Sequence, residues 1–436
     1  MNMLTAKENE TLTRTGGDTP MGQYFRRFWQ PIALSRELSE RDGPPLRVSV
    51  LGEELVAFRD TQGRIGLVDA YCPHRRANLY FGRNEECGIR CVYHGWKFDV
   101  NGKAVDLPNV PAGAKMRDEM RIKAYPTQEY GDIVWAYLGP PHTRPEVPWL
   151  EFGLVPPAHR YVGKRFNECN WAQTMEGGLD TAHFSFLHMP APKVPSNDNP
   201  DAPADARRLR WMRNDPMPKF SLLEHDVGFV IGGARAGDPQ ESYWRITQYM
   251  LPAHGTGPST LPGETYFGYT LVPITDTCHW MYTYGWNPER PIGEAERAKL
   301  DGGHGIVAAV DEHFIGIRNK RNDYLIDRCE QREKTFTGVR GLAEQDAMIQ
   351  ESQGLIADRT RESLTATDAA VVRFRRTVLT QAEHLANGEE PVAPSRHQHY
   401  NTRPGSWMAT AGMALEEVMV ERFGEPLGRM TRGRMS

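Results

Sequence analysis

The feature that most limits how this chain can fold is a pair of mixed cysteine–histidine motifs in a β-rich stretch. Cys72 and His74 form the first pair, and Cys91 and His94 form the second, with sixteen residues between His74 and Cys91. Short runs that alternate between apolar and polar residues, separated by turn-forming glycines, precede them at 46–51, 55–59 and 65–68. The pattern predicts a small all-β unit in which two loop tips each offer one thiolate and one imidazole to a common metal centre.

Four such ligands can hold zinc or a two-iron cluster. Zinc-finger spacing groups the two cysteines together and the two histidines together, whereas each pair here is mixed. Mixed pairs suit a [2Fe–2S] cluster in which both thiolates bind one iron and both imidazoles bind the other, which is the Rieske arrangement. A structural zinc site is the alternative. Cys87 lies between the pairs but outside the pattern, and we expect a bystander thiol there.

A second group of possible ligands follows, where Asp180, His183 and His188 are spaced by three and five residues. We expect a helix over 170–187. Because the two histidines would differ by roughly 140° on an ideal helix, the helix must end or distort between them. Two imidazoles at a helix end and one distant carboxylate make the facial triad of non-haem Fe(II). We expect Asp346, in a predicted helix over 343–356, to supply the carboxylate; packed histidines and a surface aspartate are the alternatives.

Composition and charge narrow the classes of function. The chain has 436 residues, 39% of them hydrophobic, which is enough for two or three domains and a large core. A formal charge of −4 gives no support to a nucleic-acid partner. No run reaches the ~18 to 20 apolar residues of a membrane span, and the first residues lack a signal-type apolar region. We therefore expect a soluble, cytoplasmic protein without membrane contact, whose six cysteines serve metal binding more than disulfides.

The chain divides into three predicted parts. Residues 1–40 are an N-terminal helical segment, in which the aromatic-rich stretch 21–34 forms a helix that closes before Pro31. Residues 41–150 are the β domain, and a proline-rich stretch within 138–158 marks its end. Residues 151–436 are the second domain, with a loop over 190–205 long enough to be a lid or an oligomer contact. Its predicted elements are a helix over 368–385 and antiparallel strands over 229–233, 243–251, 266–272 and 279–286.

In this order, the two ligand groups resemble the α subunits of Rieske non-haem iron ring-hydroxylating oxygenases over nearly the whole chain. The stretches 16–29, 243–248 and 322–328 resemble the phthalate dioxygenase-like branch. The resemblance implies an α+β fold, with an all-β Rieske domain followed by a helix-grip catalytic domain that has a broad antiparallel sheet. It also implies a catalytic Asp180 that bridges an iron histidine to a cluster histidine of a neighbouring subunit. The implied ligands are Cys72, His74, Cys91 and His94 for the [2Fe–2S] cluster and His183, His188 and Asp346 for a mononuclear Fe(II).

The function implied by the resemblance is that of an oxygenase component in aromatic compound catabolism. It would take electrons from an NAD(P)H-dependent reductase or a ferredoxin and use O2 to dihydroxylate a phthalate-like aromatic carboxylate, as a homotrimer or stacked trimers. An O-demethylating monooxygenase acting on a methoxybenzoate-like substrate is one alternative, and a Rieske electron carrier without catalysis is another. Arginine forks suit a buried carboxylate. We expect Arg235, Arg245 and Arg207 to bind it, although each could instead form an ordinary salt bridge.

Overall fold

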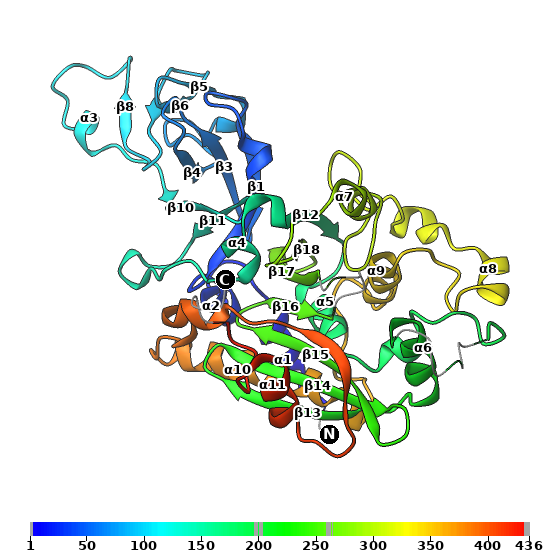
Figure 1. Cartoon of the computed structure of the whole chain (residues 1–436). Coiled ribbons are helices and arrows are strands. Elements are labelled where there is room, and N and C mark those ends of the chain that lie inside the picture. The colour runs from blue at the N-terminus through cyan, green and yellow to red at the C-terminus, as the bar shows by residue number, and fades with distance from the viewer. Residues whose placement is uncertain (1–2, 196–198, 200–203, 259–262, 264, 431–436) are drawn as a thin grey trace.

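The computed structural model describes residues 3–195, 199, 204–258, 263 and 265–430. Figure 1 shows small sheets at one end of the molecule, in blue and cyan, and a broad green sheet with its helices making up the rest. Small antiparallel sheets therefore precede one large antiparallel sheet along the chain, which confirms the predicted α+β class. The predicted limits of the three parts, at residues 40 and 150, remain predictions.

Three small sheets lie in the first part of the described chain. One has the order β1-β11-β10, with β1 Trp29–Leu34, β11 Ile133–Tyr137 and β10 Thr127–Tyr130. The second has the order β2-β3-β4-β9, with β2 Leu46–Val50, β3 Glu53–Arg59, β4 Ile65–Asp69 and β9 Ala124–Tyr125. The third has the order β5-β6-β7-β8, with β5 Arg83–Glu85, β6 Gly88–Arg90, β7 Lys97–Phe98 and β8 Ala104–Asp106. Val56, Phe58, Ile89 and Phe98 share one buried cluster with Cys72 and Cys91, so the cysteines are anchored in the core of this part.

The helix predicted within the stretch 21–34, closing before Pro31, is wrong beyond Phe25. Helix α1, Ala6–Thr13, is followed by helix α2, Pro20–Phe25, and the residues from Trp29 onward are strand β1. All six residues of β1 are buried, because the strand pairs with β11 and its side chains enter the main core. A short, continuous apolar run is compatible with a buried strand as well as with a helix, so its periodicity could not decide between them.

The large sheet has eight strands among the described residues, in the order β12-β18-β17-β16-β15-β14-β13, with β19 paired to β15. The four predicted strands all lie in it and are confirmed. Strand β15 pairs with β14 on one side and with both β16 and β19 on the other. The bounds are β12 Arg160–Asn167, β13 Lys219–His225, β14 Gly228–Ala236, β15 Glu241–Met250, β16 His254–Gly257, β17 Tyr266–Thr275, β18 Cys278–Trp286 and β19 Gly405–Thr410.

Two helices of this part position the site. Helix α5, Trp171–Leu179, begins at Asn170, whose side chain accepts a hydrogen bond from the Ala172 N–H, and packs against helix α9, Leu342–Ser352, and against β17. Gly178 is required for this packing, because a Cβ there would lie 1.9 Å from the Tyr269 hydroxyl. The other helices are α3 Met116–Glu119, α4 Glu151–Leu154, α6 Ala204–Asn214, α7 Glu294–Asp301, α8 Arg328–Glu333, α10 Ala369–Ala386 and α11 Leu415–Phe423.

Helix α10 confirms the helix predicted over 368–385, whereas α9 ends at Ser352, four residues earlier than predicted. The predicted loop over 190–205 lies in part outside the described residues, and its last two residues belong to α6. Within the described chain, none of the helices combines the length and apolar character that crossing a lipid bilayer requires.

Candidate metal centres

The two loops that carry the cysteine–histidine pairs have the same backbone geometry. In each loop the cysteine N–H donates to the carbonyl five residues later, and the cysteine carbonyl accepts from the N–H four residues later. These four hydrogen bonds measure 2.8–2.9 Å. The residue that closes each turn, Arg76 in one loop and Gly95 in the other, has a positive φ of 57° or 77°. Matched loops present their cysteines in equivalent ways although the two pairs differ in spacing.

The four predicted cluster ligands meet at these loops. Both thiols are buried, and burial together with the neighbouring Cys91 raises the pKa of Cys72 to about 11. The rings of His74 and His94 have their centroids 4.4 Å apart, and the Nδ1 atoms of both are buried without a hydrogen-bond partner in the described chain. Buried polar atoms are normally satisfied. Two unpaired ring nitrogens beside two buried thiols therefore fit a [2Fe–2S] cluster.

Aromatic side chains flank this centre on two sides. The Trp96 ring stacks on His74 at 4.5 Å and an angle of 9°, and its Nε1–H donates to Asn109 Oδ1 at 2.6 Å. On the outer side, the Tyr93 ring lies 3.9 Å from the His94 ring, and Tyr93 and Val92 are 52% and 58% exposed. The histidine side of the centre is thus covered from within and bordered by an exposed apolar tip.

The second predicted group also comes together. His183 Nε2 lies 3.1 Å from His188 Nε2, and Asp346 Oδ1 lies 3.1 Å from His188 Nε2 and 3.7 Å from His183 Nε2. Across the described residues this is the one group of at least three His, Cys, Asp or Glu side chains whose ligand atoms all lie within 4.8 Å of one another. Burial alone would raise the pKa of Asp346, but His188, His183 and Arg165 together outweigh it and the pKa is lowered. Two imidazoles and one ionised carboxylate around a common point fit non-haem iron.

The local structure that delivers these histidines differs from the prediction. Helix α5 ends at Leu179, so both histidines follow the helix and do not straddle its end. His183 opens a short 3-10 turn, His183–Ser185, and the chain then turns back so that His188 returns to it. Asp346 comes from the facing helix α9, more than 150 residues later in the sequence.

A residue that sequence reasoning missed orients His188. Gln345 Nε2 donates to Thr337 Oγ1 at 3.1 Å and to the Val339 carbonyl at 2.8 Å, so its Oε1 must be the acceptor in the 2.7 Å contact with His188 Nδ1. His188 is therefore protonated on Nδ1, which leaves Nε2 free to bind a metal. Its position next to Asp346 was the available signal, but consecutive helical residues point about 100° apart, so adjacency did not indicate this role.

Asp180 holds the other histidine. It lies at the C-terminal cap of α5, where Oδ1 accepts from the Ala182 N–H at 2.6 Å and Oδ2 lies 3.5 Å from His183 Nδ1. Burial alone would raise the pKa of Asp180, but the hydrogen bond and charge interaction with His183, together with the backbone N–H groups of Ala182 and His183, outweigh it, and the pKa is lowered. The carboxylate is thus the natural partner for a protonated His183 Nδ1. Each proposed iron histidine has its own orienting group.

Two cavities meet at this centre. Asp180, His183 and Asp346 line both of them. The first cavity is mostly apolar and is also lined by Phe184, Phe267, Tyr269, Ile306 and Arg245. The second is more polar and is also lined by Glu176, Ile349, Gln350, Glu362 and Arg375. The candidate iron site is therefore reached from two chemically different sides.

The three arginines predicted to bind a carboxylate occupy different positions. Arg245 lines the apolar cavity, is 5% exposed and donates from Nε to Thr181 Oγ1 at 3.1 Å. Arg235 is 1% exposed, does not line the cavity and donates from Nη2 to the Thr181 carbonyl at 2.7 Å. Arg207 forms an ion pair with Asp238. Of the three, Arg245 alone stands beside the proposed iron ligands.

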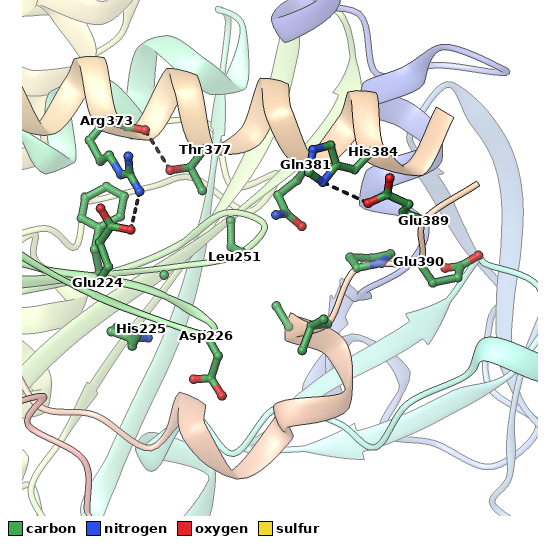
Figure 2. Close-up of a pocket in the computed structure, with 15 residues that line it drawn as sticks. Glu224, His225, Asp226, Leu251, Arg373, Thr377, Gln381, His384, Glu389 and Glu390 are labelled. Carbon is green, nitrogen blue, oxygen red and sulfur yellow. Dashed lines mark hydrogen bonds and ion pairs between the residues drawn. The ribbon is translucent and has the colours of Figure 1, made fainter. Parts of the chain in front are cut away.

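A larger pocket of about 320 Å³ lies away from this site, between α10 and the turn that joins β13 to β14 (Figure 2). Two pairs of its polar side chains contact each other, Arg373 with Glu224 and His384 with Glu389, as the dashed lines show. None of the predicted site residues lines it. This pocket is therefore not the candidate active site.

A [2Fe–2S] loop pair followed by a histidine–carboxylate iron site defines a class, the oxygenase component of a Rieske system. Two family descriptions match in the same order. The Rieske [2Fe-2S] domain matches residues 28–126, and the family described as LigXa C-terminal domain like matches residues 136–409, more than half of the chain.

Relatives and solved structures agree with this class. The oxygenase subunit of phthalate 4,5-dioxygenase from Pseudomonas putida is 38% identical, over 89% of both chains. The oxygenase subunit of 5,5'-dehydrodivanillate O-demethylase from Sphingobium sp. is 31% identical over 92% of this chain and 85% of its own. The crystal structure of dicamba monooxygenase bound to dicamba shares the fold, with a TM-score of 0.56 at 18% identity over 84% of this chain and 99% of its own.

The chain belongs to the Rieske-type aromatic oxygenases, in the branch of the phthalate dioxygenase oxygenase subunit. It is an O2-dependent oxidoreductase with a Rieske [2Fe–2S] domain, and related oxygenase components use a mononuclear iron at the catalytic site. The predicted family and enzyme class are confirmed, and a pure electron carrier is set aside.

Proposed function

We propose that this chain is the oxygenase component that dihydroxylates an aromatic carboxylate with electrons from a reductase or ferredoxin. The observation that carries the proposal is Arg245, a buried cation that lines an apolar cavity beside His183 and Asp346. No described carboxylate lies within ion-pair distance of its guanidinium, and a buried charge is costly without a counter-charge. An aromatic acid supplies that charge, while its ring packs against Phe184 and Tyr269.

Each residue of the centres has a proposed part in the reaction. Cys72, Cys91, His74 and His94 hold the cluster, and His183, His188 and Asp346 hold the iron. When bound, the two centres supply the electrons and the site at which O2 is reduced. Asp180 and Gln345 keep the two imidazoles turned so that each Nε2 faces a common point. Arg245 holds the substrate carboxylate, and the apolar lining keeps water away from the ring.

The proposed assembly is a head-to-tail homotrimer or two stacked trimers. Figure 1 shows the small sheets of the cluster part well apart from helix α9, so one chain alone keeps its two centres separate. The exposed tip at Val92 and Tyr93 is matched by Ile349, which lines the polar cavity and is 41% exposed, and by Phe186, 52% exposed and next in sequence to the lining residue Leu187. We propose that the tip of one subunit covers the polar cavity of the next, where Asp180 can reach a cluster histidine.

Binding measurements test the substrate class. Arg245→Ala should weaken phthalate binding by about 10- to 100-fold, the cost of losing a hydrogen bond to a charged group. The matched control is Arg373→Ala, in the separate pocket of Figure 2, which removes an arginine without touching the site. Equal phthalate affinity in Arg245→Ala and wild type, measured by titration calorimetry, would contradict the proposed carboxylate site.

A second candidate is O-demethylation on the same scaffold. One relative, at 31% identity, is named as an O-demethylase oxygenase subunit. Product analysis after turnover with a surrogate reductase separates the two reactions, because a cis-diol retains the ring substituents whereas demethylation releases formaldehyde. A screen across phthalate isomers, methoxybenzoates and chlorobenzoates would name the substrate class as well.

A further inference from the structure

Two buried arginines from neighbouring strands converge on Thr181, the residue that directly follows Asp180. Arg235 on β14 donates to the Thr181 carbonyl at 2.7 Å, and Arg245 on β15 donates from Nε to the Thr181 hydroxyl at 3.1 Å. Thr181 itself is 5% exposed. Thr181, which lies between the cap of α5 and His183, is therefore held from two sides by buried arginines.

The sheet leaves Thr181 little room to move. Gly233 of β14 pairs directly with Arg245 of β15, and a Cβ on Gly233 would lie 2.4 Å from Thr181 Cγ2. The absence of a side chain at Gly233 thus lets the 180–188 segment sit directly on the two strands. A change at Arg245 is then transmitted to this segment by contact and not through intervening solvent.

A second contact joins Arg245 to the histidines themselves. Its guanidinium lies 3.8 Å from the centre of the Phe184 ring, a cation–π contact. The same ring lies 4.7 Å from the His183 ring at an angle of 30°, and 4.6 Å from the His188 ring. Arg245 therefore contacts both Thr181 and Phe184, and the Phe184 ring in turn contacts both imidazoles.

The contacts of Arg235 suit a residue that positions the backbone, and they do not suit one that binds substrate. It reaches the Thr181 carbonyl, the Asp215 carbonyl and, at 3.4 Å, the Ser185 hydroxyl, all of them neutral acceptors. Burial lowers the pKa of Arg235 to about 10, which leaves it charged at neutral pH. A charged group that spans Thr181 and Ser185 ties together both ends of the turn containing His183.

We propose that Arg245 and Arg235 are positioning residues that couple the bound carboxylate to the order of the iron-histidine segment 180–188, through Thr181 and Phe184. The inference rests on the proposed carboxylate substrate. A carboxylate that takes the Nη groups of Arg245 fixes the guanidinium plane, which fixes the hydroxyl of Thr181 and the ring of Phe184. Arg235 holds the other side of Thr181, so the segment is most ordered when substrate is present. The iron site is thereby completed by the molecule on which it acts.

Hydrogen exchange of the backbone amides in 182–188 tests this coupling without any turnover. The N–H groups of Ser185, Phe186 and Leu187 are bonded within this turn, so their exchange rates report its order. In the wild-type protein, saturating phthalate should slow their exchange about fivefold or more, which is the lower end of ordinary coupling between two sites.

Three variants separate coupling from binding. Thr181→Val keeps the branched shape but removes the acceptor for Arg245, and phthalate should bind it without slowing exchange in 182–188. Thr181→Ser keeps the hydroxyl and should restore the slowing. Arg235→Lys keeps a charge but cannot span Thr181 and Ser185, and exchange in the segment should be faster than in the wild type before phthalate is added.

The outcomes are distinct. Equal slowing in Thr181→Val and the wild type, at full occupancy, would overturn the coupling and leave the proposed function intact. Failure of the wild-type protein to bind phthalate or any other aromatic carboxylate would overturn the proposed function instead. If Thr181→Val does not fold, unaltered exchange in Arg235→Lys would by itself reject the positioning role of Arg235.

Discussion

The two centres of this chain are built in opposite ways. The proposed cluster ligands lie within a stretch of 23 residues, on two matched loops that backbone hydrogen bonds close, and both cysteines are buried in one small core. The proposed iron ligands come from a turn after α5 and from the distant helix α9, and further side chains orient them. A local site depends on the geometry of its loops, whereas a long-range site depends on the whole domain that carries it.

The largest effect expected tests whether the two centres are independent. Cys72→Ser should abolish the visible absorbance of the cluster and substrate-dependent oxygen uptake, because it removes one of only two thiolate ligands. Metal binding at His183, His188 and Asp346 should persist, since no cluster residue touches that site. The matched control is Cys87→Ser, between the pairs, which should keep the wild-type spectrum. If Cys72→Ser loses both metal centres, as measured by iron content and absorbance, the two centres do not form independently.

The second prediction removes a proposed ligand of the mononuclear iron and leaves the cluster ligands in place. Asp346→Ala should remove the mononuclear metal and oxygen uptake while the cluster spectrum stays unchanged, because the two histidines lose the carboxylate that completes the facial site. Asp358→Ala, an exposed carboxylate a few residues after α9, is the control. Iron that is still bound in full by Asp346→Ala would show that another group supplies the third ligand.

Buried ion pairs between residues far apart in the sequence should also contribute strongly to the stability of the fold. Glu176 of α5 receives bidentate hydrogen bonds from Arg359 and a further one from Arg375, and its side chain is 11% exposed. Glu176→Ala leaves the buried Arg359 without a carboxylate partner, while Arg375 keeps its pair with Glu362, and the change should cost about 3–5 kcal/mol of unfolding free energy. Removing the exposed Glu119, which pairs with Lys115 on the surface, should cost less than about 1 kcal/mol. Urea unfolding of both variants measures the difference.

The same network sets a pH dependence. Burial alone would raise the pKa of Glu176, but Arg359 and Arg375 outweigh it and lower the pKa below the ordinary value of 4.5. A lowered folded-state pKa means that the contribution is complete above pH 4.5 and is lost as the pH falls through the folded-state value. Below pH 4.5 the unfolding free energy of the wild type should therefore fall by an amount that Glu176→Ala does not show. Parallel stability profiles of the two proteins below pH 4.5 would rule this out.

The smallest effect concerns the orientation of His188. Gln345→Leu removes the acceptor for His188 Nδ1–H and should weaken metal binding about 10- to 100-fold, as expected for a partner outside the ligand set. Gln345→Glu retains an acceptor and should stay closer to the wild type. Competition with a chelator measures both affinities, and an unchanged affinity in Gln345→Leu would mean that the turn alone orients His188.

The same contrast explains what the sequence could predict. Spacing alone predicts the four cluster ligands, because all four belong to two short loops. His183 and His188 were found as a pair, but the end of α5 before them was not, since 3.6-residue periodicity gives no warning of a turn that tertiary contacts stabilise. Asp346 is predicted from its residue type and its predicted helix, and the family resemblance implies the same ligand, but nothing local in the sequence connects it to the histidines.

The arginines mark the limit of such prediction. Arg235 and Arg245 lie on adjacent strands and were grouped as substrate ligands. Their separate environments depend on the register of β14 and β15 and on the way Thr181 sits over Gly233. Residue type indicated a buried cation, and only the packing distinguishes the arginine that faces the cavity from the one that supports the turn.

The pairing of β19 with β15 has a consequence for how this protein is made. Residues 405–410 form the strand beside the half of β15 that carries Arg245, and the backbone of Ser406 is in register with that arginine. Domains generally fold as units as they emerge during synthesis. Here the cation pocket cannot close until residues 405–410 have left the ribosome and paired with β15, so a nascent chain halted before residue 405 can complete its cluster loops but not its oxygenase site.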